Sequence, residues 1–106
     1  MSVWFVTRHR GATEWARRRH LIVDHRVTHL DPAQVQAGDV VVGSLPVHLA
    51  ATVCQRGAAY LHLSLDIPPT ARGRELEPDE LDTYGARLEA YEVRAVPLPS
   101  YWETTP

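Results

Sequence analysis

Short apolar runs alternate with amphipathic or turn-rich segments along the whole chain. Four of these runs are rich in β-branched and aromatic residues and end at polar turns, which predicts buried strands. They cover residues 2–7, 21–27, 39–44 and 59–65. A fifth strand is predicted over residues 86–98, with a bulge near Ala90 and Tyr91, where the alternation slips by one position. The alternative is that the preceding helix continues to Tyr91, and Gly85 argues against it.

The segments between these runs predict helices. A helix over residues 44–57 has two apolar rows at helical spacing, and Ser44 can cap its start. Shorter helices are predicted over residues 11–20, 31–38 and 78–85. In the first of these, Gly11 can cap the helix, and Glu14 lies near the third helical position, where a carboxylate suits the exposed amides.

Strand and helix therefore alternate along the chain, without internal repeats. This order predicts an α/β fold with a mainly parallel five-stranded sheet and helices on both faces. At 106 residues the chain is long enough for one such core and too short for two. We expect a single domain over residues 1–106, with an irregular tail at residues 99–106. The longest irregular stretch within the domain is residues 66–77.

Polar residues follow the predicted strands at the point where each strand ends. Parallel strands bring their carboxyl ends to one edge of the sheet, and such sheets bind ligands at that edge. The segments that would meet there are residues 7–14, 44–48 and 66–75. We therefore expect three polar loops to converge on one crevice.

The charged side chains are unevenly distributed, and the sequence contains no lysine. Residues 1–62 carry seven arginines against four acids, together with all six histidines. Residues 63–106 carry four arginines against nine acids. A guanidinium presents a planar fork that suits phosphate oxygens, so the asymmetry favours an anionic partner. A GC-rich genome is the alternative explanation for the missing lysine.

The first of the three loops combines a hydroxyl, two guanidiniums, an imidazole and a carboxylate in "TRHRGATE". Arginine forks, imidazoles and the free amides of helix starts suit phosphodiester cleavage without a metal, in which the 2′-hydroxyl of RNA attacks the adjacent phosphorus. Arg8 and His9 are the candidates in this loop, and His48 is a second imidazole that can accept a proton. Ordinary loop polarity also explains Arg8 and His9, and a hydrogen bond to the backbone also explains His48.

A divalent metal is the alternative in the segment "DHRVTHLD", where His25 and His29 lie on one side of a predicted strand, near Asp24 and Asp31. The spacing matches no established ligand pattern. Cys54 is the only cysteine, which excludes an internal disulfide and a multi-thiolate zinc site within one chain. We therefore expect no metal and no other cofactor.

Several ordered blocks of the sequence resemble one known family. The blocks are "VTRHRGATEW", "HLDPAQVQAGDVVVGSLPVHLAATVCQRGAAYLHLSLDIP", "RGREL" and "GARLEAYEV", and together they cover roughly residues 3–96. They resemble the small Csx-type CRISPR-associated proteins of type III systems, in the family numbered sixteen. The resemblance implies a Rossmann-like domain, similar in size and sheet architecture to the CARF-type sensor domains that bind cyclic oligoadenylates as homodimers.

The activity that this resemblance implies is that of a ring nuclease, which linearises a cyclic second messenger and so switches an antiviral response off. A homodimer would cleave cyclic tetra-adenylate without a metal and leave 2′,3′-cyclic phosphate ends. Arg8 would stabilise the phosphorane, His9 would act as general base or acid, and His48 would assist. The ligand would be bound by residues of all three loops, namely Thr7, Gly11, Glu14, Ser44, Leu45, Arg72 and Glu75.

Two other functions fit the same residues. A binding protein could sequester the ring without cutting it, and an interaction module could contact another CRISPR protein through Tyr101, Trp102 and the acidic second half of the chain. No apolar run approaches the length of a membrane span. We therefore expect a soluble cytoplasmic protein without a membrane partner. The resemblance implies a prokaryotic source and no double-stranded DNA as a partner.

Overall fold

The strands form one five-stranded sheet in the order β2-β1-β3-β4-β5. The computed structural model describes residues 1–102 of the chain. The strands are β1 (Val3–Val6), β2 (His25–Val27), β3 (Val40–Gly43), β4 (Ala59–Ser64) and β5 (Arg87–Tyr91). The first four strands run parallel, and β5 pairs with β4 in the antiparallel direction at one sheet edge. The predicted α/β class with a mainly parallel five-stranded sheet is confirmed, and the arrangement is Rossmann-like.

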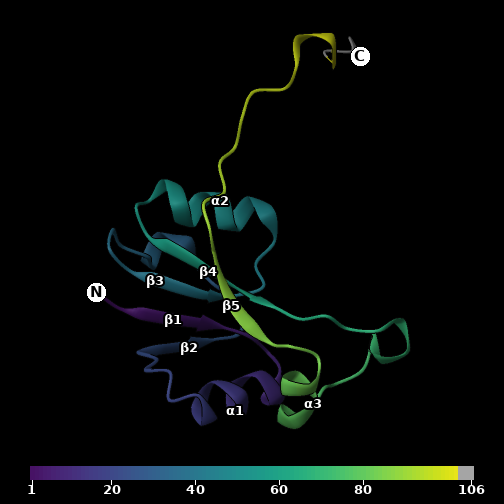
Figure 1. Cartoon of the computed structure of the whole chain (residues 1–106). Helices are drawn as coiled ribbons and strands as arrows, with labels where there is room; N and C mark the ends of the chain where they lie inside the picture. The colour runs from purple at the N-terminus through teal and green to yellow at the C-terminus, as the bar shows by residue number, and fades with distance from the viewer. Residues whose placement is uncertain (103–106) are drawn as a thin grey trace.

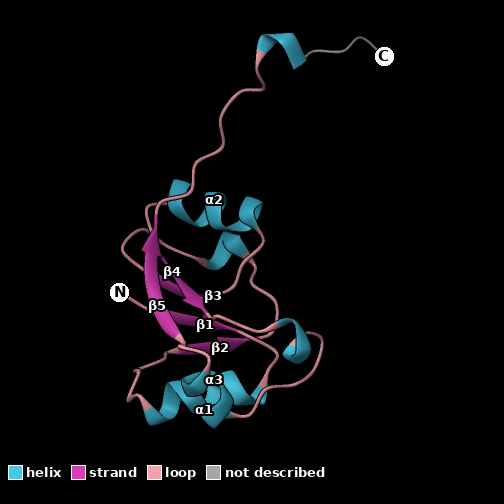
Figure 2. Cartoon of the chain, turned by 45° about the vertical axis from the view of Figure 1, so that its right-hand side comes forward, coloured by secondary structure: helices cyan, strands magenta, loops and turns pink. Residues whose placement is uncertain are grey.

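Helices cover both faces of this sheet. They are α1 (Arg10–Arg18), α2 (Val47–Gln55) and α3 (Pro78–Thr83). Helix α2 lies on one face, and α1 and α3 lie together on the other (Figure 1, Figure 2). Neighbouring strand residues point to opposite faces, so a central strand contributes to two cores. Val41 packs with Val53 of α2, whereas the adjacent Val42 packs with Trp15 of α1 and Leu81 of α3.

The buried carboxylate of Asp39 joins three segments just before β3. It accepts hydrogen bonds from the amides of Gln36 and Ser2, both at 2.9 Å, and from Trp4 Nε1 at 3.1 Å. These donors, the Gln36 amide foremost, hold the pKa of Asp39 below its ordinary value. The amino end of β1 is thereby fixed beside β3.

The strand predicted over residues 21–27 is wrong in its first half, because only His25–Val27 joins the sheet. His20 has a left-handed conformation, with φ of 59°, and turns the chain out of α1. Asp24 then hydrogen-bonds to β1, its amide donating to the Val3 carbonyl oxygen at 2.9 Å. The apolar pattern of this segment therefore reflects packing of Leu21 and Val23 against the core rather than strand pairing.

Two further predicted elements are shorter in the structure. The helix expected over residues 31–38 is a single 3-10 turn at Pro32–Gln34, which Asp31 caps by accepting from the Ala33 amide at 3.0 Å. The strand expected over residues 86–98 ends at Tyr91, and its pairing with β4 is continuous, so the predicted bulge is absent. The alternation slips there because β5 is an edge strand with little burial to enforce a pattern.

The helix starts also differ from the predictions. Helix α1 begins at Arg10 with His9 as N-cap, so Gly11 lies inside the helix, where a Cβ atom would overlap with the Leu76 carbonyl oxygen. Glu14 lies beyond the first turn of α1. Helix α2 begins after Pro46, and the Ser44 hydroxyl donates to the Leu63 carbonyl oxygen at 3.1 Å instead of capping it.

After Tyr91 the chain leaves the sheet and extends away from the domain (Figure 1). The predicted irregular tail contains a 3-10 turn at Ser100–Trp102, and its last residues, 103–106, lie outside the described part of the chain. Four large apolar side chains in this segment are exposed, namely those of Val96, Leu98, Tyr101 and Trp102. Among the helices of residues 1–102, none has the length and apolar character needed to cross a membrane.

Candidate functional site

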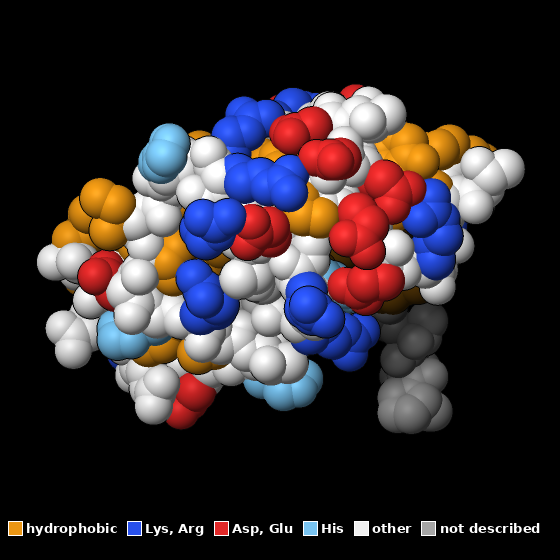
Figure 3. All heavy atoms as spheres, turned by 90° about the horizontal axis from the view of Figure 1, so that it is seen from below, with side chains coloured by type: hydrophobic (Ala, Val, Ile, Leu, Met, Phe, Trp, Pro, Cys, Tyr) orange, Lys and Arg blue, Asp and Glu red, His pale blue; other side chains and the backbone are white. Residues whose placement is uncertain are grey.

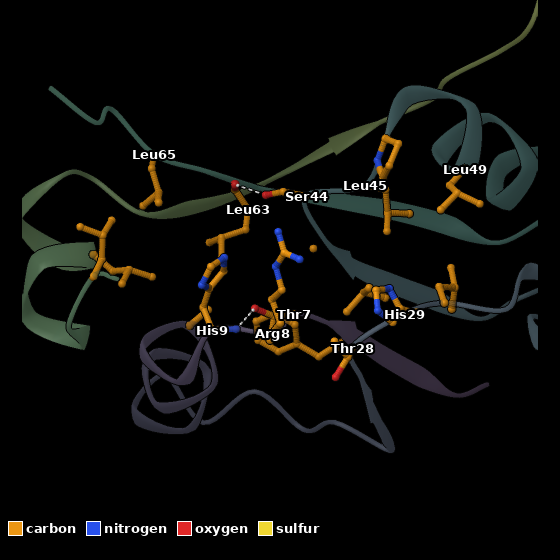
Figure 4. A pocket seen from close by; sticks show the side chains of 18 of the residues that line it. Thr7, Arg8, His9, Thr28, His29, Ser44, Leu45, Leu49, Leu63 and Leu65 are labelled. Atoms are coloured by element: carbon orange, nitrogen blue, oxygen red, sulfur yellow. Dashed lines mark hydrogen bonds between the residues drawn. The ribbon is translucent and has the colours of Figure 1, made fainter. Parts of the chain in front are cut away.

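A pocket of about 620 Å³ lies at the carboxyl ends of the parallel strands (Figure 4). Its polar lining comes from Thr7, Arg8, His9, Thr28, His29, Ser44 and Arg74. Its apolar lining includes Leu45, Leu49, Leu63, Leu65 and Ile67. We call this cavity the carboxyl-edge pocket. It joins the segments that follow β1, β2, β3 and β4, because parallel strands end on the same side of the sheet.

Arg8 and His9 lie directly after β1 and form one wall of the carboxyl-edge pocket. Both side chains point across the sheet edge towards Ser44 and Leu63 on the opposite wall (Figure 4). The His9 amide donates to Thr7 Oγ1 at 3.1 Å, which stabilises the turn between β1 and α1. Thr7 therefore shapes the loop that presents the guanidinium and the imidazole.

The His9 imidazole is held by a carboxylate from a distant part of the chain. His9 Nδ1 lies 3.1 Å from both Oε1 and Oε2 of Glu75, in the segment between β4 and α3. When Nδ1 carries the proton and donates a hydrogen bond to Glu75, Nε2 is left as a proton acceptor. Glu75 is predicted as a ligand-binding residue, but in the structure its carboxylate contacts His9. A carboxylate in this position orients an imidazole as a histidine general base requires.

The end of β3 forms the opposite wall. Gly43 and Val6 are paired in register, and a Cβ on Gly43 would lie 2.6 Å from the Val6 carbonyl oxygen, so glycine allows this close approach of β1 and β3. The Leu45 amide donates to the Tyr60 hydroxyl at 2.9 Å, and burial raises the pKa of Tyr60 above its ordinary value. The Leu45 amide, predicted to hold a phosphate together with Ser44, is therefore engaged with the protein.

Five predicted site residues lie outside the lining of the carboxyl-edge pocket. Gly11, Glu14 and Glu75 line a second hollow beside it, which shares Arg8 and His9 with the pocket. His48 is exposed on the first turn of α2, and Arg72 is exposed after the 3-10 turn at Pro69–Ala71; neither lines the pocket or the hollow. The structure thus separates His48 and Arg72 from Arg8 and His9.

Three polar lining residues were not among the predicted site residues. Arg74, two positions after Arg72, lines the pocket and forms an ion pair with Glu80. Thr28 and His29 follow β2. Their place directly after a parallel strand is the sequence signal that could have identified them as pocket residues. The sequence indicates His29 only as a possible metal ligand.

The alternative metal site is dispersed. The His25 ring stacks on Trp4 at 4.1 Å between centroids, Asp24 Oδ2 accepts from the Val3 amide at 2.7 Å, and Asp31 caps its 3-10 turn. Within residues 1–102, no three histidine, cysteine or acidic side chains gather in a way that could hold a metal ion.

The face of the molecule that carries α1 and α3 has a different electrostatic character (Figure 3). Arginines and carboxylates are interleaved there, and we call this region the α1–α3 flank. Its ion pairs include Arg18 with Asp79 at 2.7 Å and Arg19 with Asp82 at 2.8 Å. The Arg19 guanidinium, and next to it the Trp15 indole, hold the pKa of Asp82 below its ordinary value.

Arg8 has no such partner among the described residues, since no carboxylate of residues 1–102 forms an ion pair with it. Its charge is therefore available to a ligand in the carboxyl-edge pocket. An unpaired guanidinium, an oriented imidazole and an apolar wall together suit a ligand with a phosphodiester and a flat apolar ring system.

Neither the search of curated proteins nor that of solved structures finds a significant match. Residues 4–94 match the family described as "Putative CRISPR-associated protein (Cas_VVA1548)". This match covers most of the chain and confirms the CRISPR association that the sequence resemblance implies. The chain, with its arginine and imidazole at the carboxyl edge of a parallel sheet, belongs to this CRISPR-associated family.

Proposed function

We propose that this CRISPR-associated chain binds cyclic tetra-adenylate in the carboxyl-edge pocket and linearises it without a metal, which switches off antiviral signalling. The observation that carries the proposal is the contact of His9 with Glu75 beside an unpaired Arg8. This contact supports cleavage over sequestration, because it can leave Nε2 of His9 as a proton acceptor towards the pocket.

The reaction that these groups can perform is an in-line transesterification. The ribose 2′-oxygen forms a bond to the adjacent phosphorus, and the bond from phosphorus to the 5′-oxygen breaks, which leaves a 2′,3′-cyclic phosphate. His9 Nε2 accepts the proton of the 2′-hydroxyl while Glu75 holds Nδ1. The Arg8 guanidinium stabilises the charge that develops on the non-bridging oxygens.

The leaving 5′-oxygen requires a proton. His29 lines the same pocket, on the loop that follows β2. Strand β2 lies on one side of β1, which carries Arg8, and β3, which carries Ser44, lies on the other. We propose that His29 is the second imidazole of the site and donates this proton, whereas the sequence suggests His48 as an assisting imidazole. The apolar wall formed by Leu45, Leu49 and Leu65 offers a surface for an adenine ring.

The test is incubation of the protein with cyclic tetra-adenylate in EDTA, followed by chromatography of the products. The proposal predicts linear products with 2′,3′-cyclic phosphate ends, and a loss of about 100-fold or more in rate for His9→Ala. Arg94→Ala is a matched control, because Arg94 lies outside the lining of the pocket. Tight binding of an unchanged ring would instead assign the sequestering role to this protein.

We also propose that the protein acts as a homodimer. The exposed apolar side chains of Val96, Leu98, Tyr101 and Trp102 support an intermolecular contact, because the segment that carries them extends away from the domain (Figure 1). A ring of four phosphates has twofold symmetry that a twofold dimer can match. Sedimentation of the full chain should show a dimer that a Tyr101→Ser, Trp102→Ser double variant weakens. A monomer that co-purifies with another CRISPR protein would favour the interaction module.

A further inference from the structure

A second hollow, of about 780 Å³, adjoins the carboxyl-edge pocket on the side of α1 and β2. The two cavities share Thr7, Arg8, His9, Thr28 and Leu76. The second cavity also contains the arginines at positions 10, 18 and 26, and we call it the arginine hollow. Because Arg8 lines both cavities, a ligand bound at Arg8 can extend into either of them.

The acidic side chains that line the arginine hollow are all engaged by other groups. Glu75 contacts His9, Glu14 pairs with Arg17 and Arg18, and Glu77 forms the capping box of α3. Arg18 is in turn engaged with Asp79. None of these acids forms an ion pair with Arg8, Arg10 or Arg26, so the three guanidiniums have no direct carboxylate contact within residues 1–102.

Three arginines of the hollow have no ion-pair partner within residues 1–102: Arg8, Arg10 and Arg26. Arg8 and Arg10 flank His9 in the sequence, and Arg26 lies on β2, in register with Phe5 of β1. The side chain of Arg26 thus points to the sheet face that carries α1. The four arginines that line the hollow outnumber its three carboxylates, so the hollow keeps an excess of positive charge that would attract an anion.

We propose that the arginine hollow is a second anion site, which binds a phosphate of the same ligand other than the one that is cleaved. This inference rests on the proposed function, and it specifies the ligand class as a nucleotide with at least two separated phosphates. Arg8 contacts both phosphates, whereas Arg10 and Arg26 contact only the second. A mononucleotide occupies the carboxyl-edge pocket alone.

The experiment measures the affinity of the full chain for AMP and for a 2′-O-methylated cyclic tetra-adenylate, which cannot be cleaved by its own 2′-oxygen. Arg26→Ala should weaken binding of the ring about tenfold, as the loss of a charge-assisted hydrogen bond does, and leave AMP binding unchanged. The dependence of the ring affinity on salt should also become less steep in this variant, because one ion pair with phosphate is lost. Arg10→Ala should give the same pattern, and Arg94→Ala is the control outside both cavities.

Each outcome bears on the second anion site. Equal ring affinities for Arg26→Ala, Arg10→Ala and Arg94→Ala would overturn it, as would an equal loss of AMP binding. An uncleaved natural ring whose binding still depends on Arg10 and Arg26 would reject the nuclease activity and retain the second site. Absence of binding to the ring in the unmodified protein would overturn both. Thermal unfolding of each variant, compared with the unmodified chain, confirms that the exposed substitutions leave the fold intact.

Discussion

The α1–α3 flank and the carboxyl edge of the sheet both present arginines, but the arginines of the flank form ion pairs, whereas Arg8 and Arg10 at the carboxyl edge form none within residues 1–102. Arg18 and Arg19, in or directly after α1, meet Asp79 and Asp82 of α3. Arg8 and Arg10, about three turns of helix earlier in the chain, meet no acid within the described residues. The comparison teaches that the role of an arginine here follows from its partner and not from its place in a basic stretch of sequence.

The two regions also differ in what an anion would gain from them. On the flank, Arg17, Arg18 and Arg19 each pair with a carboxylate, and the pairs of Arg18 and Arg19 join α1 to α3 at the surface, where such contacts stabilise a protein modestly. At the carboxyl edge, Arg8 faces two cavities and forms no ion pair within residues 1–102. A phosphate is therefore attracted to the edge more strongly than to the flank, although both are rich in arginine.

The largest expected difference between the two regions is tested by removing one arginine from each. Arg8→Ala should lower the kcat for ring cleavage about 100- to 1,000-fold, because it removes the group that stabilises the phosphorane. Arg19→Ala, the matched variant on the flank, should leave the rate of cleavage within about twofold and act on stability alone. Rates measured by chromatography under substrate excess, with Tm values for both variants, test this. Similar losses of rate in the two variants would contradict the distinction.

A smaller effect is expected when the orientation of His9 is disturbed. Glu75→Gln retains the size of the side chain but replaces the carboxylate that contacts His9 Nδ1. Because the imidazole is then less well oriented, kcat should fall about 10- to 100-fold while KM changes little. An unchanged kcat with a raised KM would place Glu75 among ligand-binding residues instead.

The smallest effect concerns the stability of the α1–α3 flank towards acid. The pKa values of Asp82 and Glu14 are lowered in the folded chain, chiefly by Arg19 and Arg17 respectively. A carboxyl whose folded pKa is lowered stabilises the fold fully above its unfolded pKa of about 4, and this contribution is lost as the pH falls through the folded value. Asp82→Asn should therefore lower Tm by about 2–4 °C at pH 7.

The same variant gives the control for this pH dependence. The Tm of the unmodified chain should fall more steeply below about pH 4 than that of Asp82→Asn, so that the two curves converge at low pH. The buried Asp39, which is present in both chains, contributes equally to each curve. Parallel curves over the acidic range would mean that the Arg19–Asp82 pair has no part in the acid response.

The fold and one half of the site follow from local patterns in the sequence. The apolar runs around Phe5, Val42 and Leu63 predict central strands, because residues buried on both faces of a parallel sheet must be apolar. Once the strands are parallel, their carboxyl ends share an edge, and the positions of Thr7, Arg8 and His9 at that edge follow from chain order alone.

The other half of the site depends on the path of a loop, which local patterns do not determine. Glu75 reaches His9 across 66 positions of sequence because the segment after β4 is held by α3 against α1. Nothing in the sequence distinguishes Arg74, which lines the pocket, from Arg72, which does not. The start of α2 is predicted to within a few residues, yet the side chain of His48 in its first turn does not line the pocket. A correctly predicted helix therefore does not determine which of its side chains face the cavity.

The central claim is that Arg8 and His9 act on a phosphodiester within the carboxyl-edge pocket. The most direct measurement is the fate of cyclic tetra-adenylate incubated in EDTA with the unmodified protein and with His9→Ala. The account predicts linear 2′,3′-cyclic phosphate products from the unmodified protein and nearly intact ring from the variant, with similar ring affinities for both. Equal rates of cleavage by the two proteins, or an intact ring after long exposure to excess unmodified protein, would contradict it.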